Sequence, residues 1–228
     1  MKFSFIIPAL NEQGYIEKCL ASIKKQEIND YEIIVVDSYS SDATLKAAKR
    51  YKCRIFFEKR RGPAIARNTG AKRAKGMILV FADADVVFEK DFLGRIERHF
   101  EKHIGGGVCR LSTYDAWHFS HALVYEFANA LAKFFNRLGI VITGGSCFVY
   151  TKKAFDAVGG FDPKFITNED HDLARRVSKI KRFMFFDDVV VGTSARRIRS
   201  KGLFNIIRIY IKSTLVYFLN NGWLRDYW

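Results

Sequence analysis

Residues 77–85 read MILVFADAD, an apolar run that ends at two aspartates separated by one alanine. Three earlier stretches have the same apolar character, namely Phe3–Pro8, Glu32–Asp37 and Arg54–Phe57. Such short runs predict buried strands, and the segments between them carry apolar residues at helical spacing. Strands that alternate with helices of roughly 10–15 residues predict an α/β fold, with a mostly parallel central sheet flanked by helices.

Three helices are expected between these strands. The first starts at Tyr15, and the second runs through about Tyr51 with Ser41 as its cap. The third covers Pro63–Lys75 and is expected to close at Gly76.

Composition indicates a globular chain with an anionic partner. Apolar residues make up 49% of the sequence, and 38 Lys and Arg against 24 Asp and Glu give a net charge of +14. Such a balance favours nucleic acid, a membrane surface or a phosphorylated small molecule as partner. Four cysteines lie far apart, which argues against a disulfide framework or a zinc site and favours a cytoplasmic setting.

Carboxylates follow two of the expected strands. Asp37 ends the second strand, and Asp83 and Asp85 follow the fourth. Ligands of parallel sheets bind beyond the carboxyl ends of the strands. Two carboxylates two residues apart point to the same side and suit Mg²⁺ or Mn²⁺ together with phosphate oxygens. Asp37 suits a contact to a base or ribose. The alternatives are a solvated turn for the Asp83 pair and a cap for Asp37.

A third acidic group, Glu169-Asp170-His171-Asp172, opens a later helix. One of these acids is a candidate general base, and the alternative is that they satisfy the positive end of the helix dipole. The sequence has no G-x-G-x-x-G after the first strand and no G-x-x-x-x-G-K-[ST], which disfavours dinucleotide-binding and P-loop chemistry.

Several segments in a fixed order resemble glycosyltransferase family 2 over residues 3–200. They are IIPALNE at 6–12, EIIVVD at 32–37 with SSD at 40–42, GPAIARNTG at 62–70, DAD at 83–85, GGS at 144–146, VGGFD at 158–162 and EDHDLARR at 169–176. The resemblance implies a GT-A fold and a metal-dependent inverting transferase that uses a nucleotide-diphospho-sugar, UDP- or GDP-linked.

The resemblance also implies a role for each matched residue. Asp170 would be the catalytic base, and Asp85 with Asp83 would bind the divalent cation. The residues expected to bind the nucleotide-sugar are Pro8, Asn11, Glu12, Asp37, Arg67, Asp83 and Ala84. A contact to the diphosphate or the acceptor is expected from Gly145, Glu169, Arg196 and Arg197.

The sequence departs from the family pattern at two places. Ser38 stands where many members carry a second aspartate. The Q-x-x-R-W signature of processive synthases is missing, and TSARR at residues 193–197 occupies that region. We therefore expect a non-processive enzyme whose arginines hold the diphosphate or an anionic acceptor.

We expect a transferase domain over residues 1–200 and a tail over residues 201–228. In the tail, Lys201, Arg208 and Lys212 recur at helical spacing within an apolar helix expected over Leu203–Leu219. A helix of this length with two central charges suits the interface rather than the core of a membrane. We therefore expect peripheral binding to the inner face of the cell membrane. The alternative is packing on the domain or on a second copy, as in a homodimer.

Residues 123–138 also form an apolar helical face, expected mainly to join the core, with the membrane interface as the alternative. The acceptor is open between a hydroxyl and a phosphate, and a membrane lipid carrier would explain both the basic charge and the apolar helices. Two other functions remain as alternatives. One is a basic non-enzymatic α/β protein that binds nucleic acid or membrane, and the other is a nucleotidyltransferase.

Overall fold

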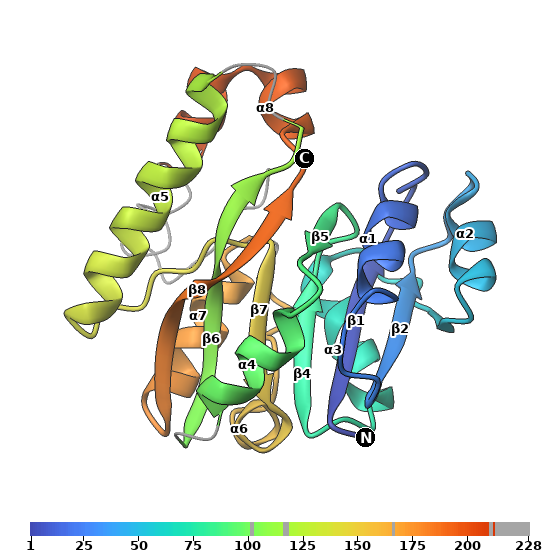
Figure 1. Cartoon of the computed structure of the whole chain (residues 1–228), viewed down its shortest axis with the longest axis horizontal. Helices are drawn as coiled ribbons and strands as arrows, with labels where there is room; N and C mark the ends of the chain where they lie inside the picture. Colours follow the sequence, from blue (N-terminus) through green and yellow to red (C-terminus); the bar gives the residue numbers. More distant parts are fainter. Residues whose placement is uncertain (101–102, 116–118, 166, 210–211, 213–228) are drawn as a thin grey trace.

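The computed structural model describes residues 1–100, 103–115, 119–165, 167–209 and 212. The described residues form one eight-stranded sheet with the order β3-β2-β1-β4-β7-β6-β8-β5 (Figure 1). The strands are β1 Phe3–Ala9, β2 Tyr31–Asp37, β3 Arg54–Phe57, β4 Ile78–Ala82, β5 Val86–Phe88, β6 Ile104–Thr113, β7 Cys147–Thr151 and β8 Arg182–Thr193. The helices are α1 Ile16–Ile23, α2 Thr44–Arg50, α3 Pro63–Arg73, α4 Phe92–Phe100, α5 Phe119–Arg137, α6 Lys152–Ala157, α7 Glu169–Ser178 and α8 Arg196–Lys201.

The sheet has a parallel half and a mixed half. Strands β3, β2, β1 and β4 pair in parallel, and Asp37 lies opposite both Ala9 and Phe57, so the carboxyl ends of β1, β2 and β3 are level. In the other half β7 is antiparallel to β4 and β6, β8 is parallel to β6, and β5 is antiparallel to β8. The predicted α/β fold is confirmed, and its parallel arrangement holds for the first half.

Helices cover both faces of the parallel half, which explains why its strands are continuously apolar. Alternate residues of a strand point to opposite faces. Phe5 and Ile7 accordingly pack with Leu20 of α1, whereas Ile6 packs with Ala66 of α3. Helix α3 lies so close to β1 that a Cβ added at Gly70 would stand 2.5 Å from Ile6 Cγ2. The sequence motif around Gly70 is therefore needed for this packing.

The expected caps of α2 and α3 were wrong. Helix α2 begins at Thr44, and Asp42 Oδ1 accepts from its backbone N–H (2.9 Å), so Asp42 satisfies this helix end. Ser41 instead donates its backbone N–H to Asn11 Oδ1 (2.9 Å) in the neighbouring loop. Helix α3 ends at Arg73, before Gly76. Gly76 is required for another reason, because a Cβ there would lie 2.5 Å from the β1 backbone.

The last described elements follow β8 directly. Helix α8 leads into residues 203–209, which are helical, and most of the helix expected over Leu203–Leu219 lies outside the described residues. Among the described helices none is long and apolar enough to cross a membrane. All four cysteines are free thiols.

Candidate active site

The two aspartates of the DAD segment lie in the short turn that joins β4 to β5. Asp83 accepts from the backbone N–H of Val86 (3.1 Å) and donates its own N–H to the carbonyl of Ser146 (3.0 Å). Ala84 is buried between the aspartates. Asp85 is only 5% exposed, and burial together with the charge of Asp83 raises the pKa of Asp85 to about 6. The turn therefore presents one partly exposed and one buried carboxylate.

Arg67 of α3 links this turn to the start of α7. Its guanidinium donates to Asp83 Oδ1 (2.8 Å) and to Glu169 Oε1 (2.5 Å), and it lies 4.9 Å from the ring centre of Phe148. Arg67 is 3% exposed, so its guanidinium is buried, while the carboxylate of Asp83 remains partly exposed. Burial raises the pKa of Glu169 to about 6, against the opposing charge of Arg67. Arg67 was expected to bind the nucleotide-sugar. In the structure its guanidinium instead pairs with the carboxylates of Asp83 and Glu169.

Asp170 follows Glu169 in the first turn of α7 and is fixed from two sides. Its Oδ2 accepts from Thr143 Oγ1 (2.7 Å) and from the backbone N–H of Gly145 (3.1 Å), and its Oδ1 lies 3.4 Å from His171 Nδ1. Burial raises the pKa of Asp170, but His171 and Thr143 outweigh burial and hold it well below its usual range. These contacts favour the ionised form of the carboxylate. Sequence reasoning missed Thr143, whose contact to Asp170 spans 27 residues.

Asp172, the third acid of the EDHDLARR segment, pairs with an arginine of its own helix. Asp172 accepts two hydrogen bonds from Arg176, one turn later in α7 (2.9 and 2.6 Å). Arg176 also donates to the carbonyls of Val158 and Gly160, which belong to the VGGFD segment. This segment and the end of the EDHDLARR segment therefore hold each other in place.

The residues expected around the nucleoside lie at the ends of β1 and β2. Asp37 is fully buried and accepts from the backbone N–H (2.9 Å) and hydroxyl (2.5 Å) of Ser40, so its carboxylate closes its own turn. Asn11 has a positive φ of 55° and ties its loop to residue 41 of the next loop. Pro8 is partly buried within β1. These contacts bring the two loops together at the edge where Asp83 and Asp85 emerge.

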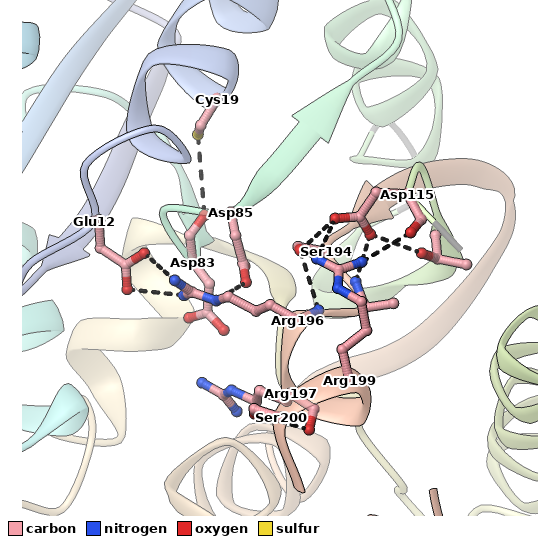
Figure 2. A network of polar contacts seen from close by, with 12 residues as sticks. Glu12, Cys19, Asp83, Asp85, Asp115, Ser194, Arg196, Arg197, Arg199 and Ser200 are labelled. Atoms are coloured by element: carbon pink, nitrogen blue, oxygen red, sulfur yellow. Dashed lines mark hydrogen bonds and ion pairs between the residues drawn. The ribbon is translucent and has the colours of Figure 1, made fainter. Parts of the chain in front are cut away.

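Arg196, the first residue of α8, reaches the same edge from the end of the chain (Figure 2). It donates two hydrogen bonds to Glu12 (2.6 and 2.9 Å), and its Nε lies 2.9 Å from Asp85 Oδ2. Its guanidinium lies 4.4 Å from the ring centre of Tyr15. The charges of Arg196 and Arg197 partly oppose the rise in the pKa of Asp85 that burial and Asp83 cause. The structure therefore joins three predicted residues, Glu12, Asp85 and Arg196, whose pairing sequence reasoning did not foresee.

Asp115 fixes the corner between β8 and α8, and sequence reasoning missed it. Its carboxylate accepts from Ser194 Oγ (2.7 Å), the backbone N–H of Ala195 (2.7 Å) and Arg199 Nη2 (2.9 Å), as Figure 2 shows. Burial opposes ionisation of Asp115, but Arg199 and the backbone N–H lower its pKa to about 2. The backbone that carries Arg196 is consequently anchored by the hydrogen bonds of Asp115.

A divalent cation fits the Asp83–Asp85 turn only with help from a ligand. Among the described residues no group of three or more His, Cys, Asp or Glu side chains is arranged to hold a metal. Asp83 and Asp85 provide two carboxylates, each already paired with an arginine. Mg²⁺ is commonly held by one or two carboxylates plus phosphate oxygens. The residues present match that pattern if a diphosphate completes the coordination.

Comparisons with known proteins agree with this geometry. Residues 4–159 match the family described as Glycosyl transferase family 2. The chain belongs to this family, which confirms the family resemblance found in the sequence.

Two curated relatives illustrate how the match is distributed. The poly(ribitol-phosphate) beta-N-acetylglucosaminyltransferase TarS of Staphylococcus aureus is 32% identical over 111 residues, which cover 45% of this chain and 19% of TarS. A relative from Methanococcus voltae is named dolichyl N-acetyl-alpha-D-glucosaminyl phosphate 3-beta-D-2,3-diacetamido-2,3-dideoxy-beta-D-glucuronosyltransferase. It is 26% identical over an alignment 247 positions long, which covers 94% of this chain and 71% of the relative. The chain thus spans a small part of TarS and most of the Methanococcus voltae relative.

Solved structures show the same fold. The crystal structure of TarS superposes with a TM-score of 0.68 at 19% identity, covering 96% of this chain and 44% of that one. The mannosyltransferase PcManGT of Pyrobaculum calidifontis, in complex with GDP-Man and Mn²⁺, superposes with a TM-score of 0.67 at 24% identity, covering 92% and 64%. The expected GT-A fold is thereby confirmed.

Proposed function

We propose that the chain transfers a sugar, with inversion, from a UDP- or GDP-linked donor to an acceptor hydroxyl or phosphate. The observation that carries the proposal is the convergence of two acidic groups at one edge of the sheet. Arg67 contacts both Asp83, beside the proposed metal ligand Asp85, and Glu169, beside the proposed base Asp170. A displacement at the sugar carbon needs both a stabilised leaving group and a base for the acceptor.

The donor side of this proposal rests on the loops that follow β1, β2 and β4. Pro8, Asn11, Glu12 and Asp37 would contact the nucleoside, and Asp85 with Asp83 would hold Mg²⁺ or Mn²⁺. When bound, the cation would neutralise charge on the leaving diphosphate. A neighbour in the same fold was solved with GDP-Man and Mn²⁺, and another with UDP-GlcNAc, which supports a nucleotide-sugar donor and a divalent cation.

The acceptor side rests on Asp170 and its neighbours. The ionised carboxylate would accept the proton of an acceptor hydroxyl, while Thr143 and Gly145 orient it. Those hydrogen bonds also lower its basicity, so the acceptor must displace one of them to make Asp170 an effective base. An acceptor phosphate arrives already ionised and does not need this step. The Asp170→Asn variant therefore distinguishes the two classes of acceptor.

A lipid-linked acceptor is part of the proposal. The name of the Methanococcus voltae relative includes a dolichyl-linked sugar phosphate, which supports an acceptor of this class. The loop that follows α5 supports it as well, because this loop carries both Thr143 and Gly145 next to Asp170 and also the exposed apolar residues Leu138 and Ile140. An apolar surface would thus border the base.

Peripheral binding to a membrane, on its inner face, completes the proposal. Leu123, Phe127, Leu131 and Phe134 are exposed on one face of α5, although this helix was expected mainly to join the core. The opposite face of α5 packs on the sheet, for example through Asn129, which exchanges two hydrogen bonds with Leu111 of β6.

Helix α5 lies on the β8 side of the molecule, with α8 near one of its ends (Figure 1). In the residues that follow α8, Phe204 is 88% exposed between the exposed bases Lys201 and Arg208. Apolar side chains bordered by bases suit the interface of an anionic membrane. A second copy of the chain is the alternative occupant of this surface.

A donor panel tests the proposed activity. Thermal unfolding is recorded with UDP-, GDP- and dTDP-sugars, each with Mn²⁺ and with a chelator. A donor that raises the midpoint only with the metal identifies the nucleotide. If no nucleotide-sugar stabilises the protein under either condition, the proposed function is wrong.

A further inference from the structure

Arg196 contacts a carboxylate oxygen of Asp85, the residue proposed to hold the metal. Its Nε lies 2.9 Å from Asp85 Oδ2, while its other two nitrogens pair with Glu12 at 2.6 and 2.9 Å. Tyr15 supports the guanidinium from its flat face at 4.4 Å. Arg196 therefore connects the turn between β4 and β5, the β1–α1 loop and α8 (Figure 2).

We propose that Arg196 is a stand-in cation that makes uptake of the metal depend on the nucleoside diphosphate. This inference rests on the proposed function. In the absence of the donor, Arg196 neutralises Asp85 and Glu12 and excludes the divalent ion. With a diphosphate and its metal bound, the Arg196 guanidinium would leave Asp85 free to hold the divalent ion and would itself pair with phosphate oxygens.

Charge balance explains why the metal alone is disfavoured. A lone dication at Asp85 would have to break the contacts of Arg196 and then remain close to a released guanidinium, with Arg67 on the neighbouring Asp83. Like charges a few ångströms apart repel each other strongly when they are partly buried. A diphosphate removes this obstacle, because guanidinium groups pair with phosphate in bidentate geometry.

The structure allows the Arg196 side chain to move while its backbone stays in place. The backbone N–H of Ala195 and the hydroxyl of Ser194 are held by Asp115, immediately before Arg196. The Arg196 side chain is itself 24% exposed and therefore accessible to a ligand from solvent. Exchange of partners thus requires rotation of one side chain on an anchored helix start.

A purely structural role for Arg196 predicts the opposite result upon mutation. If Arg196 only fastened α8 to the β1–α1 loop, its loss would loosen the site and weaken every ligand. If it competes with the metal, its loss should tighten binding of the metal alone and weaken the nucleotide. The sign of the change in metal affinity therefore separates the two roles.

The test measures Mn²⁺ binding to the full chain by electron paramagnetic resonance, which reports the free ion, with and without UDP or GDP. In Arg196→Gln we expect affinity for Mn²⁺ alone to rise roughly tenfold, because one nearby like charge is removed. We also expect the gain in Mn²⁺ affinity upon adding nucleotide to shrink. Arg196→Lys keeps the charge but loses the forked geometry, so its Mn²⁺ affinity should stay close to that of the parent chain.

Lys201→Gln is the matched control, because it removes one positive charge from an exposed position at the end of the same helix. Its Mn²⁺ affinity should not change, and an equal gain there would overturn the inference. Unchanged or weaker Mn²⁺ binding in a folded Arg196→Gln would also overturn it, while nucleotide-dependent Mn²⁺ binding would leave the proposed function standing. If the parent chain binds no Mn²⁺ even with nucleotide, the metal-dependent function fails and the inference fails with it.

Discussion

Two regions of the molecule satisfy their acidic residues in different ways. At the end of β2 and in the loop that follows it, Asp37 and Asp42 each accept a hydrogen bond from a residue two or three positions along the chain. Between the two halves of the sheet, carboxylates are paired across the sequence, as Glu12 is with Arg196 over 184 residues and Glu169 with Arg67 over 102. The hydrogen bonds of Asp37 and Asp42 join residues that are close in the sequence. The long-range ion pairs depend on the whole fold and have partners that a ligand can replace.

Under the proposed function, this contrast gives the two regions different tasks. The loops after β1 and β2 would form a preorganised surface for the nucleoside, because Asp37 and Asp42 are already hydrogen-bonded. The pairs made by Arg196 and Arg67 would balance the charges of the carboxylates until a ligand brings its own. The predictions below test this division by substituting one or two residues at a time.

The largest expected effect is on turnover in Asp170→Asn. The amide keeps the shape of the side chain but is not a base, so transfer to a hydroxyl acceptor should fall by roughly 10²-fold to 10⁴-fold while donor affinity is retained. Initial rates and donor titrations on the same preparation measure both. Asp172→Asn is the matched control, because Asp172 pairs with Arg176 in the same helix. Near-normal turnover in Asp170→Asn would assign the proton to another group or point to a phosphate acceptor.

Removal of Arg67 should have the largest effect on stability. Arg67→Met would leave two carboxylates, those of Asp83 and Glu169, buried or partly buried without their partner, which typically costs about 3–5 kcal/mol. Urea unfolding at pH 7 measures the change. Arg60→Met is the control, since Arg60 pairs with Glu58 at an exposed position. A loss below about 1 kcal/mol for Arg67→Met would show that the pairs with Arg67 do not hold the halves together.

A smaller effect is expected at Glu32 of β2, in the parallel half. Glu32 is buried and accepts from Ser4 Oγ (2.7 Å), the backbone N–H of Lys75 (2.6 Å) and Arg54. Burial raises the pKa of Glu32, but these donors outweigh it and lower the pKa below its usual range. A lowered folded-state pKa means that the stabilisation is present above the unfolded pKa and is lost as pH falls through the folded pKa.

The Glu32→Gln variant tests this stabilisation. It should cost about 1–3 kcal/mol at pH 7 and flatten the dependence of unfolding free energy on pH below about 4.5. Urea unfolding from pH 7 down to pH 3 measures both. An unchanged slope with pH would show that Glu32 contributes no charge-dependent stability.

The smallest effect on stability is expected on the outer face of α5. Phe127 is 67% exposed, so the double variant Phe127→Ser with Phe134→Ser should change the unfolding free energy by only about 0.5 kcal/mol. Its binding to vesicles that contain anionic lipid should fall sharply, because the apolar contact is removed. Co-sedimentation at low and high salt measures binding. If the parent chain stays in the supernatant and is dimeric by light scattering, the surface joins two copies of the chain.

Sequence reasoning located the strands of the parallel half but missed β6 and β8 of the mixed half. Strand β6 begins at Ile104 and continues with Gly105, Gly106 and Gly107, and such a run of glycines does not favour a strand. In the structure a Cβ on Gly106 would lie 2.3 Å from the ring of Tyr150, and one on Gly107 would lie 2.4 Å from the ring of Phe186. Glycine is needed in this strand because aromatic side chains from its neighbours pass over the backbone.

Strand β8 was missed for a different reason. Asp187 and Asp188 interrupt its apolar pattern, and polar residues in the middle of a run argue against a buried strand. The pairing of β8 with β6 shifts register at this point, since Cys109 pairs with Phe186 and Arg110 with Val190. The bulge turns both aspartates outward, where they meet Lys133 and His99. A sequence pattern does not reveal such a bulge, because partners on other elements stabilise it.

The candidate site shows the same difference between local and long-range features. Asp83, Asp85 and Asp170 were predicted from local motifs and the family resemblance, because each follows a strand or opens a helix. Their contacts to Thr143 and Arg196 join residues 27 and 111 positions apart and are formed only by the fold. The resemblance pointed to Arg67 and Arg196 as site residues, but which carboxylates they pair with must be read from the structure.

Calorimetric titration of the donor identified by the panel tests the central claim most directly. The parent chain and Asp85→Asn are each titrated with Mn²⁺ and with a chelator. If Asp85 holds the cation that binds the diphosphate, the parent chain should lose donor affinity in the chelator, and Asp85→Asn should show the same weak affinity in both conditions. Equal donor affinity in the parent chain and Asp85→Asn, with and without Mn²⁺, would contradict a metal site at this turn.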